Sequence, residues 1–177
     1  ARTAPPASTA MGISLFLVAR SDAVIEPYVT LDGMRAGDVV LAGAAAELLG
    51  EEGAALPLIE EVVDFATALG CAEAVGAIKY ANEATLEYLK TRKQFGVPIG
   101  SFQALQHRMV DMVISGEQAR SMACLAASKA DAAAGAAERA RAVSAAKIKV
   151  SDACRHVSQE AVQLHGGMGM SEELKVS

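Results

Sequence analysis

The chain has 177 residues and a formal net charge of −5; hydrophobic residues make up 52%, aromatic residues 4%, and there is no tryptophan. This alanine-rich composition suits closely packed helices better than an aromatic-rich β-sandwich. No basic block is present, so we expect no nucleic-acid partner, because phosphate binding needs clustered lysine and arginine. No apolar run reaches about 18 residues, so we expect no membrane span.

The three cysteines, Cys71, Cys124 and Cys154, are widely spaced and form no C-x-x-C pair. An odd number without paired spacing argues against a disulfide framework or a zinc site. It suits a reducing compartment such as a bacterial cytoplasm. We therefore expect three small buried side chains and no metal site.

Residues 11 to about 53 have a pattern typical of β-strands. Pro27 interrupts the second candidate strand, which places that strand at an edge or a bend. Three strands alone would leave one face of a sheet uncovered, so this part should need helices behind it or further sequence before it. The candidate strands are residues 13–18, 24–29 and 38–42, with a turn at residues 31–34.

From about residue 55 the apolar residues recur every three or four positions, which predicts amphipathic helices. The first helix should end at Gln94–Pro98, where glycine and then proline cannot continue it. The second should begin near Ser101 and break at 131–135, and the third should cover about 137–164. Long helices joined by short loops describe an antiparallel bundle. At about 30 residues, or roughly 45 Å, each is longer than a small domain needs, so we expect partner helices from further sequence or another subunit.

The residues expected in the core share these helical spacings. They are Leu56, Ile59, Val62, Phe65, Leu69, Ala72, Val75, Ile78, Leu86 and Leu89 in the first helix; Phe102, Leu105, Met109, Met112, Val113, Met122 and Leu125 in the second; and Val143, Ala146, Val150, Ala153, Val157 and Leu164 in the third.

The segment Arg92–Gly96 follows the first long helix. Arg92 offers a planar fork of donors that suits phosphate oxygens. Phe95 offers a ring face for a flat heterocycle, and Gln103, a turn into the next helix, is placed to face the same space. An alternative explains the segment without a ligand: a basic residue complements the helix dipole, and the phenylalanine packs in the corner.

The segment Gln163–Gly169 ends the third helix. Successive glycines, Gly166 and Gly167, let a backbone approach a ligand without obstruction by a Cβ atom. A glycine helix stop is the alternative. We reject a dinucleotide-binding fingerprint, because that motif needs a strand before the glycines and a helix after them.

In this order and spacing, Arg92–Gly96, Phe102–Gln103 and Gln163–Gly169 resemble the acyl-CoA dehydrogenase family. Residues 12–18, 30–33 and 37–41 resemble strands of the family's middle β-domain. The resemblance covers nearly the whole chain, and the combination of motifs favours a site over the alternatives given for each segment alone.

The resemblance implies a mainly α fold, an antiparallel long-helix bundle preceded by a partial β-domain. Residues 1–53 would be the C-terminal part of the middle β-domain. Residues 54–177 would be the C-terminal helical-bundle domain, incomplete and with three helices.

The family binds FAD, so the resemblance implies a set of cofactor contacts. Arg92 matches the arginine that reaches the FAD pyrophosphate across a dimer interface, and Phe95 matches the aromatic residue beside the flavin nucleotide. The corner at Phe95 and the bend at Gly167 must then converge, across two protomers, on one flavin nucleotide. Asp64 matches an acidic position that borders the CoA-thioester pocket. The implied FAD contacts are Arg92, Gln94, Phe95, Gln103, Gln163, Gly166 and Gly167.

Two positions depart from the family pattern. Thr67 stands where many members carry an arginine near the CoA, and Ala66 stands where a subset carry the catalytic glutamate. Most other members carry that glutamate beyond the glycine turn, so the base is expected past Ser177 and no catalytic residue is named here. Glu172 and Glu173 are too early for it.

The implied activity is FAD-dependent α,β-dehydrogenation of an acyl-CoA thioester to a trans-2-enoyl-CoA, with an electron-transferring flavoprotein as acceptor. The implied assembly is a homodimer, a homotetramer or an α2β2 heterotetramer. Two alternatives remain open. One is a non-catalytic or half-site subunit of a heteromeric dehydrogenase, with which Ala66 and Thr67 are compatible. The other is a cofactor-free helical-bundle scaffold.

Overall fold

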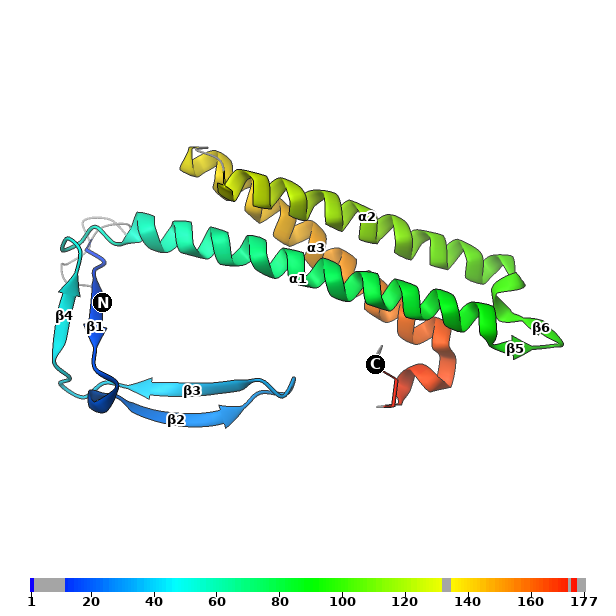
Figure 1. The fold of residues 1–177 in the computed structure, drawn as a ribbon, viewed down its shortest axis with the longest axis horizontal. Helices are drawn as coiled ribbons and strands as arrows, with labels where there is room; N and C mark the ends of the chain where they lie inside the picture. Colours follow the sequence, from blue (N-terminus) through cyan, green and yellow to red (C-terminus); the bar gives the residue numbers. More distant parts are fainter. Residues whose placement is uncertain (2–11, 132–134, 172, 175–177) are drawn as a thin grey trace. The chain divides into compact units, whose positions relative to one another are not determined.

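The structure is a computed structural model that describes residues 1, 12–131, 135–171 and 173–174 (Figure 1). The chain divides into two compact units, Ala1–Glu60 and Glu61–Ser177. The first long helix, α1 (Leu56–Thr91), begins in the first unit and continues through the second. The domain boundary expected between residues 53 and 54 stays a prediction.

The described residues of the first unit form two antiparallel β-ribbons. Strand β1 (Leu15–Val18) pairs with β4 (Ala46–Leu49), and β2 (Val24–Val29) pairs with β3 (Arg35–Val40); a short 3₁₀ turn lies between β1 and β2. The sequence analysis missed β4 and placed the third strand at 38–42, three residues late. Strand β4 consists of alanine, glutamate and leucine, which have little preference for strands. Its extended conformation therefore depends on its pairing with β1, and its own residue types do not predict it.

The turn expected at residues 31–34 is confirmed. The Thr30 amide donates a hydrogen bond to the Met34 carbonyl oxygen at 2.9 Å, and Gly33 takes a left-handed φ of +79°. The Thr30 hydroxyl donates to the Asp32 carboxylate, which lowers the pKa of Asp32. Pro27 lies opposite Gly37 within this ribbon. Large apolar side chains on both ribbons are exposed, among them Leu17, Val24, Val29, Val39, Leu48 and Leu49.

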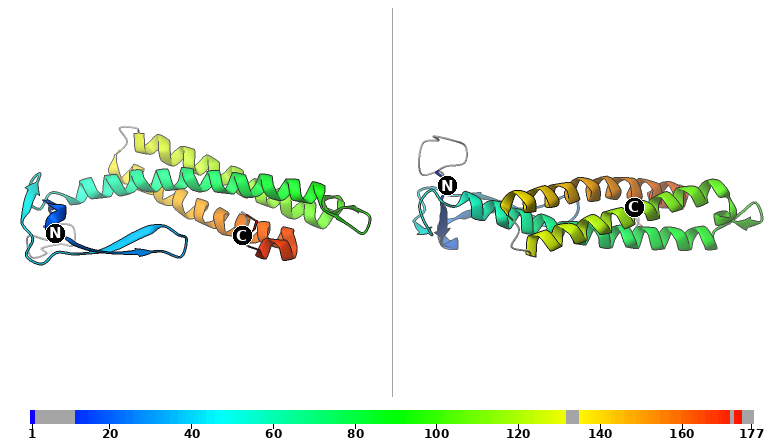
Figure 2. Two further views of the ribbon diagram at one scale, coloured as in Figure 1. Left: turned by 60° about the horizontal axis from the view of Figure 1, so that its bottom comes forward. Right: turned by 90° about the horizontal axis from the view of Figure 1, so that it is seen from above.

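The second unit is a bundle of three helices that run side by side in alternating directions (Figures 1 and 2). After α1 come the short strands β5 (Lys93–Gln94) and β6 (Val97–Pro98), a 3₁₀ turn, and then α2 (Gln103–Asp131). Helix α3 (Ala136–His165) and the 3₁₀ helix η3 (Gly166–Met170) complete it. The expected fold class, a mainly α bundle preceded by short strands, is confirmed. Most of the break expected at 131–135 lies outside the described residues.

The contact between α2 and α3 forms the centre of this bundle. All six core residues expected on α3 are buried. On α2, Met109 and Met112 are buried as expected, together with three alanines that the sequence analysis did not choose, Ala119, Ala123 and Ala126. Small side chains let the two backbones approach one another along much of their length. The alanine-rich composition therefore predicted closely packed helices correctly, because alanines form much of the contact between α2 and α3. The contact residues on α2 were predicted only in part.

The core face of α1 differs from the expected one. Val62, Phe65 and Leu69 are exposed, whereas Ala68 and Cys71 join Ile78 and Leu89 in the core. On α2, likewise, Val113 and Leu125 are exposed, and Phe102 precedes the helix. Helix α1 carries apolar residues on more than one face, and periodicity alone does not show which face packs inside the chain.

Polar contacts also join α2 to α3. The Arg108 guanidinium donates two hydrogen bonds to the Glu160 carboxylate, from Nε at 2.6 Å and from Nη2 at 3.0 Å. The Ser115 hydroxyl lies 2.9 Å from His156 Nδ1. The pairing lowers the pKa of Glu160 and raises the pKa of Arg108.

We predict that Ala119→Leu destabilises the protein. Ala119 is fully buried on α2, so the added side chain would overpack the core, at a cost of about 1–3 kcal/mol in the free energy of unfolding. Ala127→Leu, on an exposed position of α2, is the matched control and should change it by less than about 0.5 kcal/mol. Urea unfolding measures both; equal effects would contradict the close packing of Ala119.

We predict that the pair of Arg108 and Glu160 makes stability depend on pH. The folded pKa of Glu160 lies below its ordinary value of 4.5, so its contribution is complete above 4.5 and is lost as the pH falls through the folded value. The loss of stability caused by Glu160→Gln should therefore be largest near neutral pH and shrink below pH 4.5. Unfolding curves at several pH values test this; a difference that is constant with pH would contradict it.

Candidate functional site

The Arg92–Gly96 segment forms a tight hairpin after α1. The helix ends at Thr91, the Arg92 amide donates to the Tyr88 carbonyl oxygen, and the Ile99 amide donates to the Arg92 carbonyl oxygen, both at 2.8 Å. Phe95 (φ +53°) and Gly96 (φ +82°) form the two-residue loop between β5 and β6. Positive φ at both loop positions is typical of a type I′ turn. The sequence predicted a helix stop here, and the structure shows a hairpin as well.

Phe95 lies at the tip of this hairpin and is 91% exposed. Its ring meets Phe102 edge-on, with the centroids 6.2 Å apart. The alternative in which this phenylalanine packs in a corner is therefore wrong. A bulky residue is rare at positive φ, and here burial within the chain does not offset the backbone cost.

The glycine bend at the end of α3 contains three glycines with different surroundings. Gly166 takes a φ of +63° and its amide donates to the Gln163 carbonyl oxygen, so the expected glycine helix stop is confirmed. Gly167 is exposed, and a Cβ atom there would meet open space. Gly169 is buried, and a Cβ atom there would lie 2.4 Å from the Val162 carbonyl oxygen. The bend is thus held by Gly166 and Gly169, while the backbone at Gly167 is open to an approaching group.

The hairpin and the glycine bend lie at the same end of the bundle (Figures 1 and 2). Tyr88, on α1, and His165, the last residue of α3, have ring centroids 4.4 Å apart, and the Tyr88 hydroxyl donates to the His165 carbonyl oxygen at 3.3 Å. The sequence analysis missed both residues. The available signal was that Tyr88 is one helical turn before Arg92 and that His165 directly precedes the glycines. Convergence across two protomers stays a prediction.

The other predicted cofactor positions are also accessible. Gln103 is the first residue of α2, so the expectation that it lies a turn into the helix was wrong by about one turn. All seven positions have high exposure: Arg92, Gln94, Phe95, Gln103, Gln163, Gly166 and Gly167.

Asp64, the predicted substrate contact, lies in an ion pair between α1 and α3. Arg139 Nε donates to Asp64 Oδ2 at 3.0 Å, and the side chains are 14% and 16% exposed. The sequence analysis named Asp64 but missed Arg139, which is far away along the chain. One turn after Asp64, the Thr67 hydroxyl donates to the Val63 carbonyl oxygen at 2.7 Å. Ala66 is exposed and brings no titratable group.

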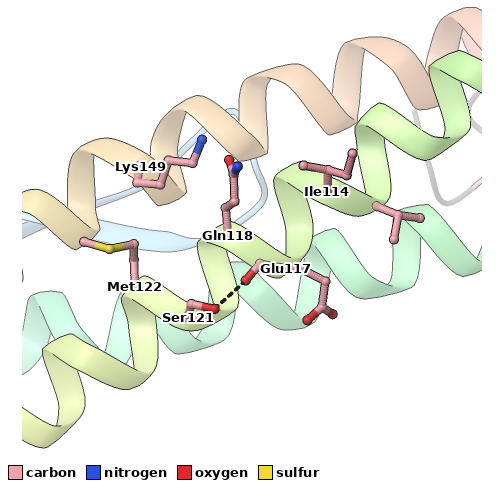
Figure 3. A pocket seen from close by; sticks show the side chains of 7 residues that line it. Ile114, Glu117, Gln118, Ser121, Met122 and Lys149 are labelled. Atoms are coloured by element: carbon pink, nitrogen blue, oxygen red, sulfur yellow. Dashed lines mark hydrogen bonds between the residues drawn. The ribbon is translucent and has the colours of Figure 1, made fainter.

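A groove of about 640 Å³ lies on another part of the bundle (Figure 3). Lys149 from α3 and several side chains from α2, including Ile114 and Met122, line it, and its surface is chiefly apolar. The Ser121 hydroxyl there donates to the Glu117 carbonyl oxygen at 2.9 Å. None of the predicted cofactor or substrate residues lines this groove, so we interpret it as helix surface.

Among the described residues, the three cysteines differ in burial. Cys71 is buried, Cys154 is half-buried and Cys124 is exposed, so the expectation of three buried cysteines was wrong for Cys124. Burial raises the pKa values of Cys71 and Cys154. Within the part of the chain that the structure describes, we find no group of three His, Cys, Asp or Glu side chains that would hold a metal ion.

Among the described residues, no helix combines the length and the apolar character that crossing a membrane requires.

Comparison with known proteins identifies the class. A family model described as "Acyl-CoA dehydrogenase, C-terminal domain" matches residues 56–177. "Acyl-CoA dehydrogenase IpdE2" of Mycobacterium tuberculosis is 35% identical over 151 residues, which cover 84% of this chain and 42% of that protein. The butyryl-CoA dehydrogenase structure from Megasphaera elsdenii has a TM-score of 0.90 at 27% identity and covers 99% of this chain and 47% of its own. The structure described as "PigA with FAD and proline" has a TM-score of 0.88 at 28% identity and covers 97% of this chain and 46% of its own.

These matches identify residues 56–177 as the C-terminal helical domain of the acyl-CoA dehydrogenase type. The chain belongs to the acyl-CoA dehydrogenase family. It spans less than half the length of these relatives.

We predict that alanine substitutions separate the two roles of the glycines. Gly169→Ala should lower the unfolding temperature clearly, because its Cβ atom would collide with the Val162 carbonyl oxygen. Gly167→Ala, two residues away, should change it little, because that side chain enters open space. Thermal unfolding followed by circular dichroism compares the two; similar melting temperatures would contradict this account of the bend.

Proposed function

We propose that the protein takes part in the FAD-dependent α,β-dehydrogenation of an acyl-CoA thioester to a trans-2-enoyl-CoA. Family membership supports an oxidoreductase of this kind. The observation that carries the proposal is the pairing, at one end of the bundle, of an exposed arginine hairpin with an open glycine bend. The names of two similar structures, a butyryl-CoA dehydrogenase and "PigA with FAD and proline", add support for the substrate class and the cofactor.

The exposed residues fit a flavin nucleotide. Arg92 supplies a charged, planar fork that suits a diphosphate. Phe95 supplies an uncovered ring at the hairpin tip, and the open surroundings of Gly167 leave room for a ligand beside the backbone. When bound, FAD accepts the electrons of the oxidation.

The chain's own residues bind and orient in this proposal. Arg92 neutralises the diphosphate, and Phe95 covers one part of the nucleotide and excludes water. The amides of Gln94, Gln103 and Gln163 form hydrogen bonds with its polar atoms, and Gly166 provides backbone room. Since the hairpin is exposed, we propose that it reaches FAD held by a second protomer, in a homodimer or a homotetramer.

Asp64 is the proposed substrate contact, and the ion pair fixes where it acts. Arg139 holds the carboxylate between α1 and α3, so Asp64 is positioned before an acyl-CoA arrives. The catalytic carboxylate is proposed to lie past Ser177, because Ala66 carries no base and Glu173 is an exposed residue next to the bend. We further propose an electron-transferring flavoprotein as acceptor and a reducing compartment, in which the thiols stay free.

A second candidate is a half-site subunit of an α2β2 heteromeric dehydrogenase. Ala66, which carries no base, and Thr67, whose hydroxyl donates to the Val63 carbonyl oxygen, are compatible with this candidate. They are equally compatible with an ordinary subunit whose base lies past Ser177. Such a subunit would still contribute its hairpin to the cofactor. The purified protein alone would then lack turnover and recover it on addition of a partner subunit.

We predict that Arg92→Gln weakens FAD binding by about 10- to 100-fold, because a charge-assisted hydrogen bond to the diphosphate is lost. Retained flavin is measured by absorbance near roughly 370 and 450 nm. Lys90→Gln removes the same charge from the last turn of α1 and should leave FAD retention unchanged.

Unchanged FAD retention in Arg92→Gln would contradict the proposed role of Arg92. A full-length protein that binds no FAD, even with partner subunits, would favour the cofactor-free scaffold; absence of FAD from this chain alone would not, because the chain spans less than half the length of its relatives.

A further inference from the structure

Tyr88 is joined to both candidate binding segments. Its carbonyl oxygen accepts the hydrogen bond of the Arg92 amide, at the root of the hairpin. Its side chain, on the inner side of α1, meets His165 at the end of α3, with the rings tilted by 31° and their centroids 4.4 Å apart. A shift of Tyr88 would therefore move the hairpin and the glycine bend relative to one another.

His165 is held from two directions. The residue is 4% exposed, and its Nδ1 lies 2.8 Å from the Ala161 carbonyl oxygen. A carbonyl oxygen accepts hydrogen bonds, so Nδ1 carries the proton and donates it. The His165 carbonyl oxygen accepts the Tyr88 hydroxyl. Both the ring and the peptide group of His165 are thus fixed directly before the bend.

The residues that follow His165 are held in place as well. Gly166 turns the chain with a φ of +63°, and its amide is bound to the Gln163 carbonyl oxygen. Three residues further on, Gly169 packs against the Val162 carbonyl oxygen so closely that no side chain fits. The backbone at Gly167 is therefore held between fixed points on both sides.

We propose that Tyr88 and His165 are positioning residues that fix the glycine bend relative to the Arg92 hairpin, so that each segment is already in place for its contact with FAD. The inference rests on the proposed function for its ligand, since it concerns how the same cofactor is held. Neither residue needs to touch the cofactor, because each acts through the backbone of the segment beside it.

The experiment compares Tyr88→Leu and Tyr88→Phe with Tyr80→Leu in the purified protein. Tyr80 lies two turns earlier on α1 and is 49% exposed, which makes it a matched control. Titration with FAD gives the dissociation constant, and amide hydrogen exchange of residues 166–171 reports the bend without cofactor. Thermal unfolding shows what part of each effect is general destabilisation.

Tyr88→Leu should raise the dissociation constant for FAD by about three- to tenfold, the size expected for losing one aromatic pair. It should also speed hydrogen exchange in the bend. Tyr88→Phe keeps the ring, so its dissociation constant for FAD should stay within about twofold of the wild-type value. A role in which Tyr88 only fills space would predict the same result. His165→Ala is therefore included, and it should reproduce the effect of Tyr88→Leu. Tyr80→Leu should change neither quantity.

Three results would overturn the inference. The first is that Tyr88→Leu and Tyr80→Leu bind FAD equally well and differ in melting temperature alone. The second is that exchange in the bend is the same in both variants. The third result concerns the case in which Tyr88→Leu does not fold. FAD binding and hydrogen exchange at wild-type values in His165→Ala would then overturn the inference. A full-length protein that binds no FAD would contradict the proposed function, and hydrogen exchange would still test whether Tyr88 and His165 fix the bend.

Discussion

The close packing of α2 against α3 is the contact on which the other features depend. Alanines such as Ala119 on α2 and Ala146 on α3 are fully buried where the two backbones approach, so the relative position of the two helices is tightly constrained. Both helices are about 30 residues long, and a bundle of such helices brings distant segments together at its two ends. The hairpin before α2 and the bend after α3 lie at the same end of the bundle for this reason.

Polar and aromatic contacts then set the details that apolar packing leaves open. The pair of Arg108 and Glu160 joins α2 to α3, and the pair of Asp64 and Arg139 joins α1 to α3. The rings of Tyr88 and His165 join α1 to the end of α3 close to the bend. These hydrogen bonds and ion pairs have defined geometries, so they add directional contacts to the close apolar packing. The proposed binding residues thus depend on contacts outside the site itself.

The sequence predicted some of these features better than others, for physical reasons. Helix ends were accurate where glycine or proline acts locally, as at Gly166. All six core residues predicted on α3 are buried because its heptad spacing marks the packed face, although Ala161 and His165, which are also buried, were not predicted. On α1, Val62 and Phe65 were placed in the core wrongly, because that helix has apolar residues on several faces. The ion pair of Asp64 with Arg139 joins residues far apart in the sequence, and no local pattern encodes such a contact. The hairpin was missed because positive φ at Phe95 contradicts the ordinary preference of phenylalanine.

That left-handed backbone at Phe95 has an evolutionary consequence. Asparagine or glycine would adopt the turn more easily, so selection for folding alone would drift away from an aromatic residue at this position. Phenylalanine stands there instead, with its ring in solvent in the single chain, and the proposed contact with FAD would oppose that preference in the assembled protein. Mutational libraries sorted separately for abundance and for activity would then favour different residues at the same codon.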